Sequence, residues 1–469
     1  MESTDKKDLL LSQINKNSIL FFSLFSAWLL TIPFHGQLIY CLYGKFNIDL
    51  RNIPLISISA HFLGLIFSGY IVDSLNKANK AIIHITIICI IGTMMFFLPY
   101  NLLWNISLYA MSFAAGIYIG SWGFYFKKFT KANKKVETIV KVLILSNVFM
   151  LIINTIAINI SIYFALSLTI TFLVISLIVV SNIPKPNILG KGKDVIIKVI
   201  DISKPMGLLW IFIAIITINS GLMYSVVTPA FSHHVKLTSW YWAIPYIVVL
   251  FLLMKSPDKT NKAYILNIAI AIIGISFLLF IILDRSIPSY LLINTLMLGA
   301  FGVCDLFWWS IIGELIDYVK NPAKIFGIGL SANVFGILVG DVIIAKLNIT
   351  AIEFNSTVFA LIIVFIILMI LPSLHKHLSL IINQHIFLFR LYDNKSEKVE
   401  DTINKYPGLT SRENEIVDLL LKGRTYKMIA EELYLSENTI KTHIKNIYAK
   451  YNINSKAELI KILTITRKR

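Results

Sequence analysis

GLTSRENEIVDLLLKGRTYKMIAEELYLSENTIKTHIKNIYAKYNINSKAELI, residues 408–460, decides the fold of the last part of the chain, because short helices with clear ends replace long apolar runs here. Residues 410–413 (TSRE) match a capping box, in which the Thr hydroxyl and the Glu carboxylate satisfy free amide groups at a helix start. Ile416, Leu419 and Leu420 follow at helical spacing, and Gly423 marks a stop. The pattern predicts a first short amphipathic helix.

Two further helices are expected after this one. The second covers about residues 426–433, residues 434–436 make a tight turn, and Ser436 caps a third helix over about residues 437–451. The apolar residues of the third helix recur at i, i+4, i+7 and i+11 as a stripe that we expect to be buried: Ile440, Ile444, Ile447 and Tyr451. Residues 426–445 therefore form a predicted helix-turn-helix.

The opposite face of the third helix is polar, and part of the second helix adds to it. Lysine and arginine can neutralise phosphates or donate to guanine, and Thr and Asn add shorter hydrogen-bonding contacts. Residues 406–469 hold twelve Lys and Arg against seven Asp and Glu, a balance that favours phosphate. The predicted DNA-binding residues are Arg424, Thr425, Lys427, Ser436, Thr439, Lys441, Thr442, Lys445 and Asn446.

This stretch resembles the LuxR-type helix-turn-helix domain in several motifs in order: LTSRE, the KG stop, IAEEL, LSENTIKTHIKNIYAKY and the final AELI. It departs from the family at Tyr451 and Asn452, where Leu and Gly are usual. The resemblance implies that Lys441, Thr442 and Lys445 face base edges. It also implies that Thr425, Ser436 and Thr439 lie near phosphates, and that a last helix over residues 455–464 pairs two copies on double-stranded DNA.

The rest of the chain has the composition of a membrane protein. Of all 469 residues, 57% are hydrophobic and only 15% are charged, whereas soluble domains have about 25% charged residues. We expect an all-α protein in which twelve apolar runs of membrane-spanning length form six plus six helices. They begin near residues 18, 52, 81, 103, 136, 161, 206, 239, 263, 289, 325 and 354.

These runs define the expected domain organisation. A cytoplasmic N-terminal segment, residues 1–17, and the first six-helix half, residues 18–183, precede a central basic loop over residues 184–205. The second half, residues 206–372, is followed by a juxtamembrane segment and linker, residues 373–405, and by the DNA-binding domain, residues 406–469.

The basic residues of the connections predict the orientation. The N-terminus and the even-numbered connections hold 20 Lys and Arg, against five in the odd-numbered ones. By the positive-inside rule both termini are cytoplasmic. The first residues lack a small-residue cleavage site after a short apolar region, so we expect a retained helix and a multi-pass protein of the bacterial cytoplasmic membrane.

The membrane segment resembles the major facilitator superfamily. Gly69 and Asp73, with Lys77 and Lys80 after them, match the Gly-x-x-x-Asp loop motif of that superfamily, although Ser74 replaces its usual Arg. DLFWW and NPAKIFGIGLSANVFGILVG look like the membrane part of major-facilitator proteins fused to LuxR-type domains in some bacteria. The resemblance implies two halves around a central cavity.

Ionisable residues inside spans are costly and mark candidate sites. The candidate ligand residues are Asp305, Trp308, Trp309 and Asp341, and the weaker ones are His35, His61 and His84. In the alternative interpretation the tryptophans pack between helices, and Glu314 and Asp317 lie at the interface near Lys320 and Lys324. The three cysteines show no disulfide or metal-ligand spacing. We expect no cofactor and, without a P-loop or nucleophile elbow, no enzyme.

The leading hypothesis is a one-component transcriptional regulator: the transporter-like domain senses a small molecule or a membrane state, and its conformation controls DNA binding. The alternative is an active secondary transporter with a fused regulatory tail.

Overall fold

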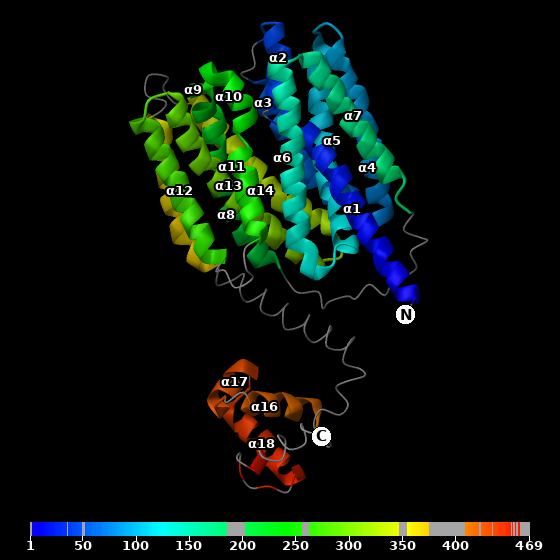
Figure 1. Cartoon of the computed structure of the whole chain (residues 1–469), viewed down its shortest axis with the longest axis vertical. Coiled ribbons are helices and arrows are strands. Elements are labelled where there is room, and N and C mark those ends of the chain that lie inside the picture. Colours follow the sequence, from blue (N-terminus) through cyan, green and yellow to red (C-terminus); the bar gives the residue numbers. More distant parts are fainter. Residues whose placement is uncertain are drawn as a thin grey trace. The chain divides into compact units, whose positions relative to one another are not determined.

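The computed structural model describes residues 2–34, 36–48, 52–184, 202–255, 262–346, 354–374, 409–421, 424–433, 435–451, 453, 455 and 458–459. The chain forms two compact units, Met1–Leu378 and Ser379–Arg469. Each is a bundle of helices (Figure 1). Residues 375–405 of the expected juxtamembrane segment and linker, and residues 185–201 of the expected central loop, lie outside the described residues.

The first half of the membrane unit is drawn from blue to blue-green in Figure 1. Three short helices, α2 (Gln37–Lys45), η1 (Met95–Phe97) and η2 (Ala132–Lys134), accompany six long ones. The long helices are α1 (Glu2–Thr31), α3 (Ile53–Ile71), α4 (Leu75–Met94), α5 (Leu102–Phe129), α6 (Lys135–Asn159) and α7 (Ile162–Ser181).

The second half, drawn from green to yellow, is less regular. Its first helix, α8 (Ser203–Leu222), continues through the π-helical turn η4 (Met223–Val227) into α9 (Thr228–Ala230). Its remaining helices are η5 (Ser232–His234), α10 (Val235–Tyr241), α11 (Ile244–Lys255), α12 (Lys262–Ile282), α13 (Ile287–Leu315), η6 (Ile316–Tyr318), α14 (Pro322–Lys346) and the helix over Phe354–Leu374.

The number of bundle helices agrees with the sequence pattern. Among the described residues, eleven helices are long and apolar enough to cross a membrane. The one predicted span that is not among these eleven is the first, which corresponds to α1. This helix packs against α6 and α7 but carries Asn15, Lys16 and Asn17 in its middle. All twelve predicted starting points fall in or beside these helices, so the all-α, multi-pass prediction is confirmed.

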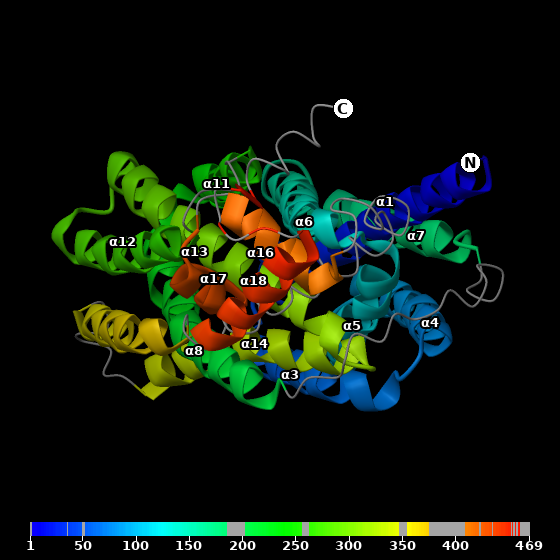
Figure 2. The same ribbon diagram turned by 90° about the horizontal axis from the view of Figure 1, so that it is seen from below.

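The two halves meet along two seams. On one, α14 packs against α3 and α5, and on the other, α6 packs against α10, α11 and α13. Figure 2 shows α3, α5 and α14 side by side. A Cβ atom on Gly327 of α14 would overlap the Leu65 carbonyl and the Ser68 side chain of α3. Only glycine allows the two backbones to come this close.

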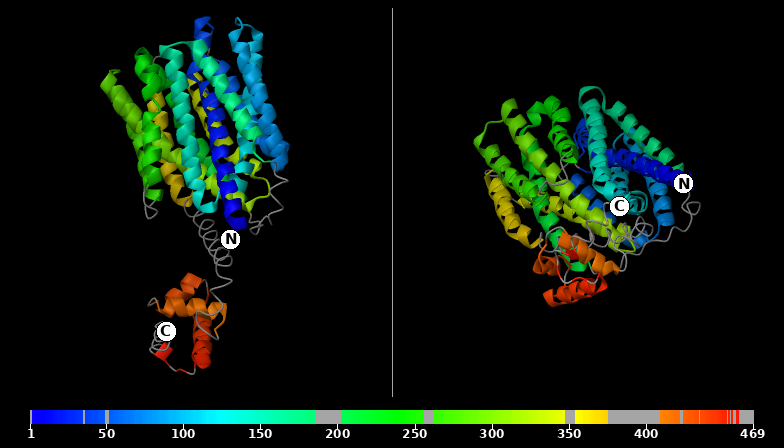
Figure 3. Two further views of the ribbon diagram at one scale, coloured as in Figure 1. Left: turned by 45° about the vertical axis from the view of Figure 1, so that its right-hand side comes forward. Right: turned by 60° about the horizontal axis from the view of Figure 1, so that its bottom comes forward.

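The C-terminal unit contains α16 (Ser411–Leu421), α17 (Tyr426–Leu433) and α18 (Glu437–Tyr451), packed as one group (Figure 3). The bounds of α17 and α18 are those that the sequence predicts. Its buried core is Ile416, Val417, Leu419, Leu420, Ile429, Ala430, Ile440, Ile444, Ile447, Ile453 and Leu459.

Tyr451, predicted as the end of the buried stripe, is only partly buried, because it lies in the last turn of α18 at the edge of the core. Of the expected last helix, residues 455–464, only residues 455, 458 and 459 are described. Leu459 is fully buried in the core, and the rest of that prediction lies outside the described residues.

Candidate DNA interface and intramembrane cavity

Side-chain hydrogen bonds cap the start of α16 and connect it to α18. Glu413 Oε2 accepts from the Thr410 amide at 2.7 Å, and Thr410 Oγ1 accepts from the Glu413 amide at 3.3 Å. The predicted capping box is therefore present. Lys450 near the end of α18 donates to the same Glu413 oxygen at 2.6 Å. Burial alone would raise the pKa of Glu413, but the hydrogen bonds from Lys450 and Thr410 outweigh it and hold that pKa below its usual value.

The turn between α17 and α18 is held at both ends. Arg412 Nη2 donates to the Leu433 carbonyl at 3.0 Å and so satisfies a free acceptor at the end of α17. Ser436 Oγ accepts from the Thr439 amide at 3.0 Å, as an N-cap should. Thr425 Oγ1 accepts from the Met428 amide at 3.3 Å. The hydroxyls of Ser436 and Thr425 thus order the two helix starts, a role that the sequence pattern indicated for Ser436 alone.

The outer face of α18 is polar and exposed. Lys441, Thr442, Lys445 and Asn446 are all exposed, whereas Ile440, Ile444 and Ile447 on the opposite face are buried. Lys441 pairs with Glu437 at 2.9 Å, and Thr442 donates to the Asn438 carbonyl at 3.0 Å.

The remaining predicted DNA residues surround this face. Thr439 is partly exposed, and Thr425, Ser436 and Arg424 are exposed. The side chain of Lys427 lies outside the described residues. The predicted residues whose side chains are described therefore lie on α18, at its start and at the start of α17. A helix that enters the major groove needs polar side chains in such positions.

A cavity of about 530 Å³ lies within the membrane unit. Helices of both halves line it, and its wall contains ten aromatic side chains, two asparagines of α6 and one carboxylate, Asp305 of α13. Tyr246 of α11 donates to Asp305 Oδ2 at 2.8 Å. Trp309 also lines the cavity and packs edge to face against Phe22 and Phe326.

The other predicted ligand residues lie elsewhere. Trp308 is fully buried outside the lining, because adjacent residues of an α-helix point about 100° apart and its neighbour Trp309 takes the cavity side. Asp341 is also outside the lining and accepts from Ser225 of η4 at 2.5 Å. Of the weaker candidates, His61 lines the cavity, His84 is exposed on α4, and His35 lies outside the described residues.

Several cavity residues were not predicted from the sequence. Asn147 and Asn154 line it from α6, seven residues apart and therefore on one face of that helix. Tyr224 lies in η4, within electrostatic range of both Asp305 and Asp341. The sequence signal for the first two is a pair of asparagines at helical spacing in an apolar span. Tyr224 is marked only by the structure, through the π-helical turn, a feature that is common at functional sites.

Polar contacts join the two halves at one end of the membrane unit. Lys135 of α6 pairs with Asp317 of η6 at 2.6 Å and donates to the Gly313 carbonyl at 2.9 Å. Lys127 donates to the Val319 carbonyl at 2.6 Å. The alternative interpretation of the sequence placed Asp317 at the membrane interface near Lys320 and Lys324. Its ion-pair partner is instead Lys135 from the other half.

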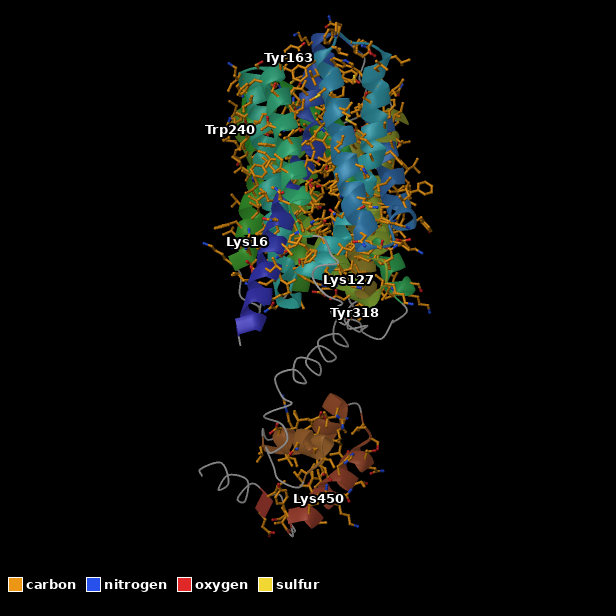
Figure 4. All side chains as sticks on the ribbon, turned by 90° about the vertical axis from the view of Figure 1, so that its right-hand side faces the viewer. Lys16, Lys127, Tyr163, Trp240, Tyr318 and Lys450 are labelled. Atoms are coloured by element: carbon orange, nitrogen blue, oxygen red, sulfur yellow. The ribbon has the colours of Figure 1, made fainter. Side chains whose placement is uncertain are left out.

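One further contact completes this set. Asn321 donates to the carbonyls of Gly69 and Val72 at 2.7 and 3.1 Å. We call the four side chains of Lys127, Lys135, Asp317 and Asn321 the inter-half clamp. Figure 4 shows Lys127 and Tyr318 at this end of the unit, toward which Lys16 of α1 also lies, and Tyr163 at the opposite end.

Comparisons with known proteins find relatives of the C-terminal unit in sequence and neighbours of the membrane unit in fold. The family model described as bacterial regulatory proteins, luxR family, matches residues 407–463. Over 61 residues, 13% of this chain, the sequence is 36% identical to the spore germination protein GerE of Bacillus subtilis and covers 82% of it. It is 42% identical over 52 residues, 11% of this chain, to the transcriptional regulatory protein DegU of Brevibacillus brevis, of which it covers only 22%.

The membrane unit resembles solved transporters in fold. The human organic anion transporter MFSD10 matches with a TM-score of 0.58 at 12% identity, over 78% of this chain and 99% of that one. A bacterial homologue of the iron transporter ferroportin matches with a TM-score of 0.59 at 14% identity, over 78% of this chain and 98% of that one.

Fold and sequence together define the class: an all-α, multi-pass membrane protein with a transporter-like fold that carries a helix-turn-helix DNA-binding domain. Through that C-terminal domain, the chain belongs to the luxR family of bacterial regulatory proteins.

Proposed function

We propose that this protein is a one-component transcriptional regulator that binds DNA from the cytoplasmic membrane. The observation that carries the proposal is the exposed polar face of α18, held in place by the Glu413–Lys450 ion pair and the Ser436 cap, on a chain whose other unit is a membrane bundle. Lys441, Thr442 and Lys445 read bases, and Thr425, Ser436 and Thr439 lie near phosphates. Both termini are cytoplasmic, and two copies pair through the last helix, residues 455–464.

The membrane unit supplies the signal. A ligand in the cavity shifts the unit between conformations only if it binds one of them better than the other. The inter-half clamp is formed in the conformation seen here, so a state in which it opens is the natural alternative. We infer that this change controls whether two C-terminal domains can pair on an operator.

The experiment that tests DNA binding maps genomic sites by crosslinking the full-length protein in cells. The test variant carries Lys441→Ala and Lys445→Ala, and the control carries Lys16→Ala and Lys80→Ala, two exposed lysines of the membrane unit. We expect discrete sites that the control keeps and the test variant loses. If the wild type enriches no sites under several growth conditions, the regulator proposal is wrong.

Secondary transport is the second candidate, because Asp305 places an ionisable group in a cavity between two transporter-like halves. Uptake of a candidate solute into proteoliposomes would support transport if Asp305→Asn abolishes that uptake. Binding of a ligand without uptake would support a receptor.

A further inference from the structure

We propose that the cavity binds a small organic cation, whose positive charge lies against Asp305 and whose apolar body packs on the aromatic wall. This inference names the ligand class for the sensing role proposed above and rests on that role only for its biological meaning.

The charge of the cavity favours a cationic ligand. Asp305 is the one carboxylate in the lining, and none of the described lining residues is Lys or Arg. Tyr246 is the only described side chain that hydrogen-bonds to Asp305, and it occupies Oδ2. A carboxylate in a membrane span is costly without a partner of opposite charge. A cationic ligand supplies that partner through Oδ1.

Asp305 lies close in depth to a polar side chain of the other half. Lys135 and Asp317 lie at one level, because they form an ion pair. Asn147 is 12 residues after Lys135 and Asp305 is 12 residues before Asp317, so each lies about 18 Å from the clamp along its helix. The two halves thus present Asp305 and Asn147 to the cavity at about the same depth. Asn147 Nδ2 donates to the Leu143 carbonyl at 2.8 Å, which leaves Oδ1 as an acceptor for the N–H group of an amine.

The wall of the cavity is rich in aromatic rings. Ring faces attract cations, most strongly where water is excluded, and Tyr224, Trp242, Tyr246 and Trp309 are all in the lining. A volume of about 530 Å³ suits a ligand with a ring or short chain beside its charged group.

Two polar atoms in the lining have no protein partner. Asn154 Oδ1 and the Tyr290 hydroxyl are buried without a hydrogen bond. Asn154 belongs to the first half and Tyr290 to the second, and both lie farther from the clamp than Asp305 along their own helices. Buried polar atoms normally have partners. A polar group on the ligand body can supply them.

The test uses purified full-length protein and two probes of the same shape. Benzyltrimethylammonium carries the charge, and neopentylbenzene replaces its nitrogen with carbon. Binding is measured without DNA, by quenching of tryptophan fluorescence and by thermal stabilisation. We expect the wild type to bind the cation about 10- to 100-fold more tightly than the neutral probe, because only the cation is attracted by the Asp305 carboxylate and by the ring faces of the wall. The anion benzoate serves as a third probe. Equal binding of the cation and the neutral probe, or tighter binding of benzoate than of the cation, would overturn the proposal without any variant.

Variants then locate the charge. Asp305→Asn should remove the preference for the cation, Asp305→Glu should keep most of it, and Asp341→Asn, outside the lining, should leave it unchanged. A preference for the cation that survives Asp305→Asn in folded protein would refute the proposal, and so would a preference that is lost in Asp341→Asn. The binding assay contains no DNA, so the two proposals can fail separately. A wild-type protein that does not prefer the cation but occupies genomic sites would reject the ligand class alone. Cation binding without genomic occupancy would reject the regulator alone.

Discussion

Lys135 of α6 and Asp317 of η6 form a nearly buried ion pair of 2.6 Å that joins the two membrane halves across 182 residues of sequence. Their side chains are only 6% and 17% exposed. Each charge therefore compensates the other, and we expect the contact between the two halves at this end of the unit to depend on both.

Loss of either charge should open the clamp. Asp317→Asn leaves Lys135 buried without its counter-ion, and breaking a buried pair costs about 3–5 kcal/mol. We expect a cysteine introduced at Ala323, which is fully buried beside the clamp, to react with a water-soluble maleimide at least about tenfold faster in this variant. Exchange of the two residues, Lys135→Asp with Asp317→Lys, should restore slow labelling. Unchanged labelling in Asp317→Asn would show that the pair does not hold the halves together.

Glu413 should make the stability of the C-terminal unit depend on pH. Its pKa in the folded state is held below the usual 4.5, so the stabilisation is complete above that pH and is lost as pH falls through the lower folded-state pKa. Glu413→Gln should lower the free energy of unfolding at pH 7 by about 1–3 kcal/mol. Urea denaturation of residues 406–469, which have their own core, checks this from pH 7 to pH 3. The Gln variant should lose less stability over this range, and parallel curves would contradict the assignment.

Lys445 and Lys441 should differ in their effect on DNA binding. Lys441 must give up its pair with Glu437, whereas no ion pair to Lys445 is found among the described residues. If they contact bases, replacement by Ala costs about 1–3 kcal/mol and relaxes sequence preference. We expect the larger loss for Lys445→Ala. Fluorescence anisotropy with operator and mismatched DNA measures both effects, and unchanged affinity in both variants would exclude this docking of α18.

The helices could be predicted from the sequence because their signals are local. Apolar runs of about 20 residues mark the spans, and the TSRE box and Ser436 mark the helix starts of the C-terminal unit. These features depend on residues within a few positions of one another. For the same reason the bounds of α17 and α18 agree with the prediction.

The cavity could be predicted only in part, because its residues meet through rotation and packing of distant helices. Asp305 and Asp341 have similar surroundings in sequence, yet only Asp305 lines the cavity. Trp308 and Trp309 are neighbours, and only Trp309 reaches it. The partner of Asp317 lies 182 residues away, and no local pattern identifies such a partner.

Gly327 should be required for close contact of the halves at the clamp, and Gly207 provides a matched control. A methyl group on Gly327 would overlap backbone and side-chain atoms of α3, whereas one on Gly207 of α8 would meet nothing within 4 Å. Gly207→Ala should therefore keep or slightly raise stability, since Ala is favoured over Gly in a helix by about 1 kcal/mol.

Gly327→Ala gains the same helix preference but must move α14 away from α3. The movement lengthens the Asn321 contacts to Gly69 and Val72, which lie on the same seam. Maleimide labelling of the cysteine at position 323 should accordingly rise in Gly327→Ala and stay slow in Gly207→Ala. If both variants label slowly and unfold alike, the α3–α14 seam tolerates separation, and the closed state rests on the Lys135–Asp317 seam alone.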